Sequence, residues 1–403
     1  MLSAFAALAS GLWLLAILGG SRRSIPHLPP RNDAPSPAPR ALTVLVASRD
    51  EGEAPRRLGA DLRAQRGPLT IRWVLVDDRS RAPIAAEALP EPSGGLSVLR
   101  LDAAPEGWLG KVHALHRGLE LVDDELVLLT DADVRFEPDA LATAVGYFEA
   151  AELDYLCLLP RYDDRSWLLE PTLVAAERLL LAGRRAHAVG RPGSRAYVGL
   201  GAFALVRRSA LSASGGFTPL RLAVLDDVAL ARQLRDHGAR LGVLRSGGHV
   251  HLEQYGHLGR FVRGQEKTML AAGGYRPLRT ALVGVALLAL ALAPLGALCF
   301  SSTRVWGLAC LATGTLAVYR EGRLAGRRSG WGAWVALGHF VMGLTAIRAA
   351  VLGALRGGLA WRDATYSLEM LRVHWTGRRC APQPGRDATK NRGKIRDVTP
   401  REE

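Results

Sequence analysis

Acidic side chains gather at three places in the chain, each directly after a short apolar run. They are Ser48-Arg49-Asp50-Glu51, Asp77-Asp78 and Asp131-Ala132-Asp133. Any one cluster alone is commonly a solvated loop or the cap of a helix. Clustered carboxylates repel one another unless a cation binds among them, and hard oxygen ligands suit Mg²⁺ or Mn²⁺ holding a diphosphate. Together the clusters predict a divalent-metal site that binds a nucleotide-diphosphate substrate.

The apolar runs before these clusters predict the elements that position them. Residues 42–46, 71–76 and 126–129 are short, apolar and end abruptly at charged residues. With the helical patterns between them, they predict an α/β layer over residues 41–279 with buried parallel strands. In such a sheet the ligand crevice lies beyond the carboxyl ends of the strands. We therefore expect the three acidic clusters at one edge of the sheet.

Six short motifs occur in an order that resembles the family-2 glycosyltransferases. They are Ala47-Ser48-Arg49-Asp50-Glu51, Val76-Asp77-Asp78-Arg79-Ser80, Gly110-Lys111-Val112-His113-Ala114-Leu115, Thr130-Asp131-Ala132-Asp133, Leu225-Asp226-Asp227 and His257-Leu258-Gly259-Arg260-Phe261. The resemblance covers roughly residues 41–264, and the last motif looks like a degenerate Gln-x-x-Arg-Trp element. It implies a GT-A fold, an α/β nucleotide-diphospho-sugar transferase fold with a mainly parallel sheet flanked by helices, plus membrane helices at both ends.

The resemblance also implies roles for individual carboxylates. Glu51 and Asp78 would contact the nucleoside of the donor, and Asp131 and Asp133 would hold the metal, Mg²⁺ or Mn²⁺, and the diphosphate. Asp227 would deprotonate the acceptor hydroxyl. These roles agree with the chemistry, because a leaving nucleoside diphosphate needs its charge neutralised and an attacking hydroxyl needs a base.

Two cations are expected on the donor side of the same site. Lys111 starts a predicted helix, where a positive charge opposes the helix dipole, so a phosphate partner explains it better than helix stability does. Arg260 is expected to neutralise charge on the leaving diphosphate. By the same resemblance, the acceptor side is assigned to Asp226, Gly201, His257 and Phe261.

Some of these residues have simpler interpretations. Asp226 and Asp227 precede an apolar helical pattern at 228–234, so one of them could cap that helix while the other catalyses. Glycines 199 and 201 are explained by a tight turn alone. Phe261 stands where the family has tryptophan, which keeps an aromatic face for a sugar or lipid but loses the indole donor. This change argues against long-chain, processive synthesis.

Apolar segments at both ends predict attachment to a membrane. Residues 1–20 are expected to be an N-terminal anchor, followed by a Pro-rich linker at 21–40; arginines 22 and 23 place the next domain in the cytoplasm. A cleaved signal peptide is the alternative, but the charged segment that precedes a signal's apolar core is missing. The apolar segments predict a multi-pass protein of a bacterial-type inner membrane. The net charge of +14 suits nucleic acid, anionic lipid headgroups or phosphorylated substrates and does not choose among them.

The C-terminal membrane helices are expected between residues 280 and 355. Residues 281–300 and 305–319 predict a hairpin, whereas 331–355 contains His339 and Arg348 and is expected to be interfacial or re-entrant. An amphipathic helix near 254–271 would lie at the bilayer surface. The tail, 356–403, is basic and is expected to be partly disordered.

The layout, together with Pro105-Glu106-Gly107-Trp108-Leu109-Gly110-Lys111 and Trp361-Arg362-Asp363-Ala364-Thr365-Tyr366, looks most like hopene-associated and ceramide-glucosyltransferase-like enzymes. This resemblance implies transfer of a single sugar, with inversion, from a nucleotide-diphosphate sugar to a lipid or lipid-linked hydroxyl. A polyisoprenyl-phosphate sugar transferase, a processive polysaccharide synthase and a catalytically silent membrane scaffold are the alternatives. No nucleic-acid module is present, so nucleic acid is excluded as a partner. The sugar, the nucleotide and the oligomeric state stay open.

Overall fold

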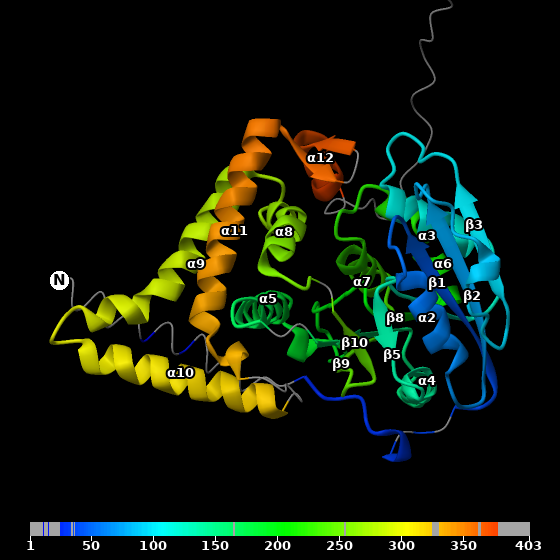
Figure 1. Ribbon diagram of the computed structural model, residues 1–403, viewed down its shortest axis with the longest axis horizontal. Coiled ribbons are helices and arrows are strands. Elements are labelled where there is room, and N and C mark those ends of the chain that lie inside the picture. Colours follow the sequence, from blue (N-terminus) through cyan, green and yellow to red (C-terminus); the bar gives the residue numbers. More distant parts are fainter. Residues whose placement is uncertain are drawn as a thin grey trace, which may run out of the picture.

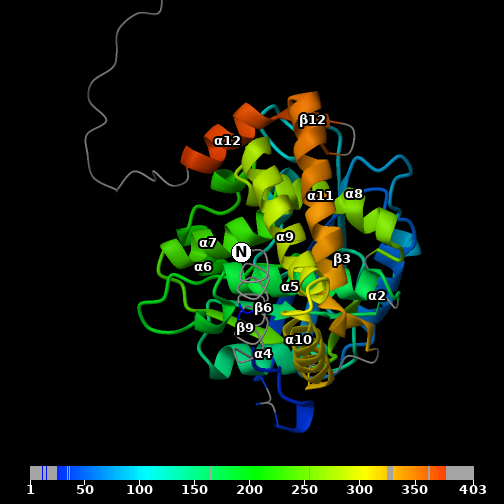
Figure 2. The same cartoon turned by 90° about the vertical axis from the view of Figure 1, so that its left-hand side faces the viewer.

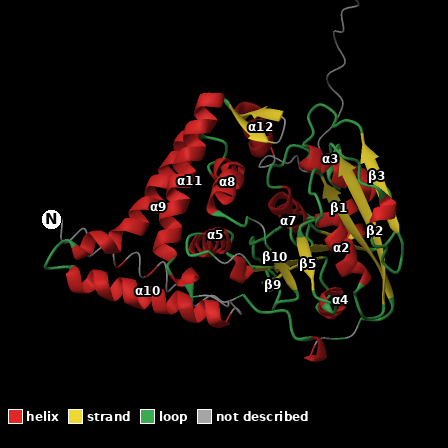
Figure 3. Ribbon diagram, in the orientation of Figure 1, coloured by secondary structure: helices red, strands yellow, loops and turns green. Residues whose placement is uncertain are grey.

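The computed structural model describes residues 11, 15, 25–33, 35, 37–163, 166–253, 255–324, 330–361 and 364–377. Strands gather on one side of the molecule and long helices on the other, as Figures 1 and 3 show. The predicted N-terminal anchor lies outside the described residues except for Gly11 and Leu15.

A seven-stranded sheet forms the centre of the strand-rich side, in the order β3-β2-β1-β4-β8-β6-β9. Neighbouring strands run parallel except at β8, which is antiparallel to both β4 and β6. The predicted parallel strands are confirmed as β1, β2 and β4, and they are buried because apolar residues fill them. The bounds are β1 (Arg40–Ser48), β2 (Leu69–Asp78), β3 (Leu96–Leu101), β4 (Leu126–Leu129), β6 (Tyr155–Leu159), β8 (Ala204–Arg207) and β9 (Leu241–Arg245).

Helices cover both faces of this sheet, and a core cluster fills each face. On one face, Gly118 lets α3 approach β1 closely, since a Cβ there would stand 2.4 Å from the Leu45 side chain. A second, three-stranded sheet has the order β5-β10-β7. The elements are α2 (Ala54–Arg63), α3 (Gly110–Leu119), α4 (Ala140–Ala150), α5 (Leu169–Gly183), α6 (Arg208–Ala213), α7 (Asp226–Asp236), β5 (Val134–Phe136), β7 (Arg161–Tyr162) and β10 (Val250–Leu252). Short 3-10 turns lie at Arg31–Asp33, Ala86–Ala88, Ala186–Ala188, Thr218–Leu220 and Trp331–Ala333.

The helix-rich side is the C-terminal region, residues 258–377. Figure 2 shows α9, α10 and α11 from their outer side. α9 crosses α11 at two glycines: a Cβ on Gly284 would lie 2.8 Å from the Gly343 carbonyl oxygen, so small residues permit close approach. The bounds are α8 (Leu258–Ala272), α9 (Pro277–Leu298), α10 (Arg304–Leu324), α11 (Val335–Arg356), β11 (Gly358–Trp361), β12 (Ala364–Ser367) and α12 (Leu368–Gly377).

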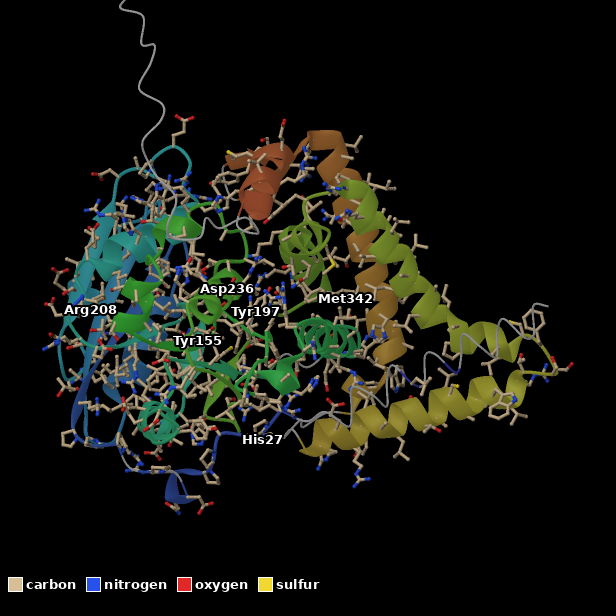
Figure 4. The ribbon with its side chains drawn as sticks, turned by 180° about the vertical axis from the view of Figure 1, so that it is seen from behind. His27, Tyr155, Tyr197, Arg208, Asp236 and Met342 are labelled. Carbon is tan, nitrogen blue, oxygen red and sulfur yellow. The ribbon has the colours of Figure 1, made fainter. Side chains whose placement is uncertain are left out.

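α11 packs against α5 of the sheet-bearing part near its start and against α8 near its end. Near its start, a Cβ on Gly338 would stand 2.0 Å from the carbonyl oxygen of Pro171 in α5, and near its end Gly353 lies against Leu270 of α8. Between these points Met342 is buried and points from α11 toward α5 and α8 (Figure 4). α11 is therefore the seam between the C-terminal region and the rest of the molecule.

Two helices of the described chain are long and apolar enough to cross a membrane, α9 and α11. α9 corresponds to the predicted segment 281–300. α10 contains the predicted segment 305–319 but does not meet the same criterion, because Arg320, Glu321 and Arg323 lie within the helix. α11 covers most of the segment 331–355, which was expected to be interfacial. Half of the apolar stretch of this helix is buried inside the protein.

The linker and the tail differ from a plain extended chain. The Leu28 amide donates to the Arg245 carbonyl at 2.8 Å, and the Arg245 amide donates to Pro26 at 2.8 Å. This part of the predicted 21–40 linker thus docks beside β9. In the predicted 356–403 tail, residues 358–377 fold into the hairpin β11–β12 and the helix α12; residues 378–403 lie outside the described residues.

Candidate active site

A cavity of about 480 Å³ opens at the carboxyl ends of β1, β2 and β4. Five residues predicted as donor-binding line it together: Glu51, Asp78, Lys111, Asp131 and Asp133. The sheet brings them together because their strands are parallel neighbours, so their ends meet at one edge.

The turns after β1 and β2 are fastened to each other. The Asp50 amide donates to the Ser80 hydroxyl at 3.0 Å, and the Arg81 amide donates to the Asp50 carboxylate at 2.8 Å. Buried Asp77 accepts from the Ser80 amide at 2.8 Å and from the Arg100 guanidinium at 2.6 Å. Asp77 therefore holds the turn, which leaves its neighbour Asp78 facing the cavity.

Asp78 lies against the first turn of α3. Its carboxylate accepts from the Arg79 guanidinium at 2.8 Å. A Cβ on Gly110 would stand 2.3 Å from the Asp78 carboxylate, so only glycine lets α3 begin this close. The next residue, Lys111, then points into the site.

Lys111 has carboxylate partners, where a phosphate was expected. Its ammonium lies 2.7 Å from Asp131 and 3.4 Å from Asp226. Burial would lower the pKa of Lys111, but the charges of Asp131 and Asp226 raise it above its usual range. Lys111 is charged throughout the physiological range and joins the end of β4 to the start of α7.

Asp133 faces a concentration of negative charge. Burial, followed by the charges of Asp131 and Glu51, raises the pKa of Asp133 to about 7. Within the described part of the chain, no three His, Cys, Asp or Glu side chains are grouped to hold a metal ion. Asp131 and Asp133 nevertheless fit Mg²⁺ or Mn²⁺, which are commonly held by one or two carboxylates together with the phosphates of a substrate.

Asp227 lies behind Lys111, at a much smaller cavity of about 20 Å³. Lys111 and Asp131 line both cavities and therefore separate them. Leu225 is the N-cap of α7, so Asp226 and Asp227 belong to its first turn, and Asp227 accepts from the next residue's amide at 2.7 Å. Burial and the charge of Asp226 raise the pKa of Asp227 to about 6.

The loop that contains glycines 199 and 201 lies between the two acidic centres. A Cβ on Gly201 would stand 2.5 Å from the Asp131 carboxylate, and one on Gly199 would stand 2.0 Å from the Asp227 carbonyl oxygen. A tight turn, the simpler interpretation of these two glycines, does not by itself explain such close contacts. The loop uses glycine because any side chain would displace Asp131 or the start of α7.

Residues 39–245, just over half of the chain, match the family model described as "Glycosyltransferase like family 2". The chain belongs to this family. It is a glycosyltransferase, and the predicted family and enzyme class are confirmed.

Solved glycosyltransferases resemble the fold at low sequence identity. Mannosyltransferase PcManGT from Pyrobaculum calidifontis, in complex with GDP-Man and Mn²⁺, overlaps with a TM-score of 0.50 at 18% identity, over 90% of this chain and 100% of its own. S. aureus TarS overlaps with a TM-score of 0.40 at 14% identity, over 70% of this chain and 50% of its own. No curated protein matches the sequence significantly. The mannosyltransferase overlap and the sheet order support the predicted GT-A fold.

The glycosyltransferase does not bring the motif at 257–261 to either cavity. His257 caps α8, accepting from the Arg260 amide at 3.3 Å. The Arg260 side chain is exposed. Phe261 is fully buried and packs edge-on against Tyr255 at 5.0 Å, so its ring is not available to a sugar or a lipid.

The cavity is also lined by residues that no site prediction named, among them Trp108, Lys267 and Tyr366. Lys267 lies on α8, seven residues beyond Arg260. Burial and the nearby charge of Lys111 lower the pKa of Lys267. Its one sequence signal is the charged pair Glu266-Lys267 inside an otherwise apolar helix face. Tyr366 follows a different helix entirely, so nothing local connects it to the acidic motifs.

Proposed function

We propose that this glycosyltransferase transfers a single sugar, with inversion, from a nucleotide-diphosphate sugar to the hydroxyl of a lipid or lipid-linked acceptor. One observation carries the proposal. The cavity that collects four carboxylates and two lysines has one wall made by α8, and α8 packs on α11, a helix apolar enough for a membrane. A charged donor site thus adjoins an apolar surface.

Glu51 and Asp78 form the nucleoside end of this donor site; both line the larger cavity, whereas Asp227 lines the smaller one. Asp131 and Asp133 would hold Mg²⁺ or Mn²⁺ together with the donor diphosphate, and Mn²⁺ is present in the mannosyltransferase complex. When bound, the metal would supply positive charge to the diphosphate. Lys111 and Lys267 supply two further positive charges at the same place.

Asp227 acts as the base. It removes the proton of the acceptor hydroxyl while that oxygen attacks the anomeric carbon, and the bond from this carbon to the diphosphate oxygen breaks with inversion. Lys111 turns from Asp131 toward the leaving diphosphate, because its ammonium is the group between the two cavities. Asp226 then keeps Lys111 at the start of α7.

The acceptor comes from a membrane that the C-terminal region contacts. Large apolar side chains are exposed on the outer faces of its helices, among them Leu282 and Val285 of α9 and Leu355 of α11. A soluble protein rarely exposes so many together. We place the sheet in the cytoplasm, on the side predicted by arginines 22 and 23, with residues 1–20 as a further anchor.

A donor screen tests the proposal. Membranes containing the full chain are incubated with labelled UDP-, GDP- and other nucleotide sugars plus Mn²⁺ or Mg²⁺, and the lipid extract is counted. We expect label in lipid from one donor, loss of this label on chelation, and loss of metal-dependent donor binding in Asp133→Ala. Label that stays water-soluble for every donor would contradict a lipid acceptor, and full activity in chelator would contradict the metal.

A further inference from the structure

The family match ends at residue 245, but residues beyond it also line the donor cavity. Tyr366, more than a hundred residues later, lines the same cavity as Asp78 and Asp131. It belongs to the hairpin β11–β12, which follows directly on α11. The donor cavity is therefore completed by a segment that the family model does not contain.

The position of Tyr366 is fixed by the end of α11. The helix stops at Gly357, whose φ of +59° turns the chain back. The Leu368 amide donates to the Gly357 carbonyl at 3.1 Å and closes the base of the hairpin. Tyr366 pairs across the strands with Leu359, which is fully buried. Since cross-strand partners share a face, Tyr366 and Leu359 lie on the inner face of the hairpin, where Leu359 fills the core and Tyr366 lines the cavity, while exposed Thr365 lies on the other face.

The charged groups around Tyr366 show which end of the cavity it covers. Burial raises the pKa of Tyr366, and the charges that act on it belong to Arg79, Asp78 and Arg49. These residues stand in the turns after β1 and β2. None of the charges that act on Tyr366 belongs to Asp131, Asp133 or Lys111. Trp108, a second aromatic residue, also lines the cavity.

We propose that Tyr366 is a donor-binding residue whose ring packs against the nucleoside, and that the hairpin 358–367 is the roof of the nucleoside end of the site. This inference rests on the proposed function, because it takes the donor to be a nucleotide-diphosphate sugar. A diphosphate held at Asp131 and Asp133 directs its nucleoside toward Asp78, and so beneath Tyr366. Aromatic side chains bind nucleobases by stacking on their faces, whatever the base.

Calorimetry on the full chain in nanodiscs with Mn²⁺ tests this, using UDP, GDP and inorganic pyrophosphate as probes. Pyrophosphate occupies the metal end alone, so it reports on that end without the nucleoside. We expect Tyr366→Ala to weaken binding of the preferred nucleoside diphosphate about tenfold or more. Binding of pyrophosphate should stay unchanged, and Tyr366→Phe should stay within about twofold of wild type because it keeps the ring. Thr365→Ala, on the opposite face of the same strand, is the matched control.

The outcomes separate the two claims. Equal nucleoside diphosphate binding by Tyr366→Ala and wild type overturns the inference and leaves the proposed function intact. A parallel loss of pyrophosphate binding also overturns it, since Tyr366 would then support the whole site and not the nucleoside. If wild type binds pyrophosphate but neither nucleoside diphosphate, the proposed function itself fails.

Discussion

The family-matched region, residues 39–245, and the C-terminal region, residues 258–377, bury their apolar residues in different ways. In the first, aliphatic strands are covered on both faces and charges stand at the strand ends. In the second, small residues face inward, as at Gly284, Gly338 and Gly343, while large apolar side chains face outward. The first arrangement is that of an α/β core covered on both faces, and the second agrees with the proposed contact of these helices with a membrane.

This difference assigns separate tasks to the two regions. In the proposed mechanism, the family-matched region carries the carboxylates for donor and proton chemistry. The C-terminal region supplies one lysine and one tyrosine to the same cavity and otherwise presents apolar surface. The following variants and measurements test that division of tasks.

The largest effect is expected from the base. Asp227→Asn should lower sugar transfer by about 10²–10⁴-fold, the usual contribution of a positioned acid or base, while nucleoside diphosphate binding stays within a few fold. Initial rates and calorimetry measure the two. Asp236→Asn, at the other end of α7, is the control. If Asp227→Asn transferred sugar at the wild-type rate, Asp227 would not be the base.

The pH profile tests the same carboxylate without a mutation. The pKa of Asp227 is raised to about 6, and the base must be ionised to accept a proton. At saturating Mn²⁺, which keeps Asp133 ionised, activity should therefore be steady above that pH and fall about tenfold per unit below it. A log plot of kcat/KM against pH measures this limb. A flat profile down to pH 5 would contradict the assignment.

The packing of α8 on α11, within the C-terminal region, should depend on Glu266. Its carboxylate, 10% exposed, accepts from Arg348 at 3.1 Å and Arg356 at 2.9 Å, both on α11. Glu266→Ala should cost about 1–3 kcal/mol of unfolding free energy, a figure reduced for the partly exposed arginines. Thermal unfolding in detergent measures it. The exposed pair Glu53 and Arg56 is the control, and a Glu266→Ala cost no larger than that of Glu53→Gln would make this contact incidental.

Replacing a glycine with alanine should have opposite effects on stability at the contact between α11 and α5 and on the outer surface of α9. Gly338→Ala places a methyl 2.0 Å from a backbone oxygen of α5 and should destabilise by about 1–3 kcal/mol. Gly296→Ala in α9 meets nothing within 4 Å and should stabilise by about 0.5–1 kcal/mol. Matched melting curves compare them. Equal shifts would show that α11 is not packed as described.

The smallest effect concerns two thiols. Burial, with the charge of Asp227, raises the pKa of Cys157 to about 12, whereas Cys299 is exposed at the end of α9. A maleimide at pH 7.5 should label Cys299 and leave Cys157 unmodified until the protein unfolds, as mass spectrometry of peptides would show. Rapid labelling of Cys157 in the native protein would mean that the core next to Asp227 is accessible to solvent and would contradict the burial of Cys157.

The sequence predicted most of what is local. Strands β1, β2 and β4 follow from apolar runs that end at charged residues, and the cavity that gathers Glu51, Asp78 and Asp133 follows from parallel strands. The partners of Lys111 did not follow, because Asp226 comes to it only when α7 docks on the sheet.

The rest depends on tertiary packing. Arg260 was expected at the cavity from its motif, but the turn of α8 leaves it exposed and presents Lys267 instead. Tyr366 ends one of the motifs quoted for the resemblance, but its place at the cavity could not be predicted, because that place depends on how the chain turns after α11. Phe261 has the composition of a binding aromatic, yet it fills the core.

The most direct test of a transferase site built by both regions is transfer of labelled sugar into lipid by wild type, Lys267→Ala and Lys267→Arg. With Lys267 neutralising the leaving diphosphate, we predict a loss of about 10²-fold for Lys267→Ala and substantial recovery for Lys267→Arg. Wild-type transfer by Lys267→Ala would show that the family-matched region works alone and would contradict the account.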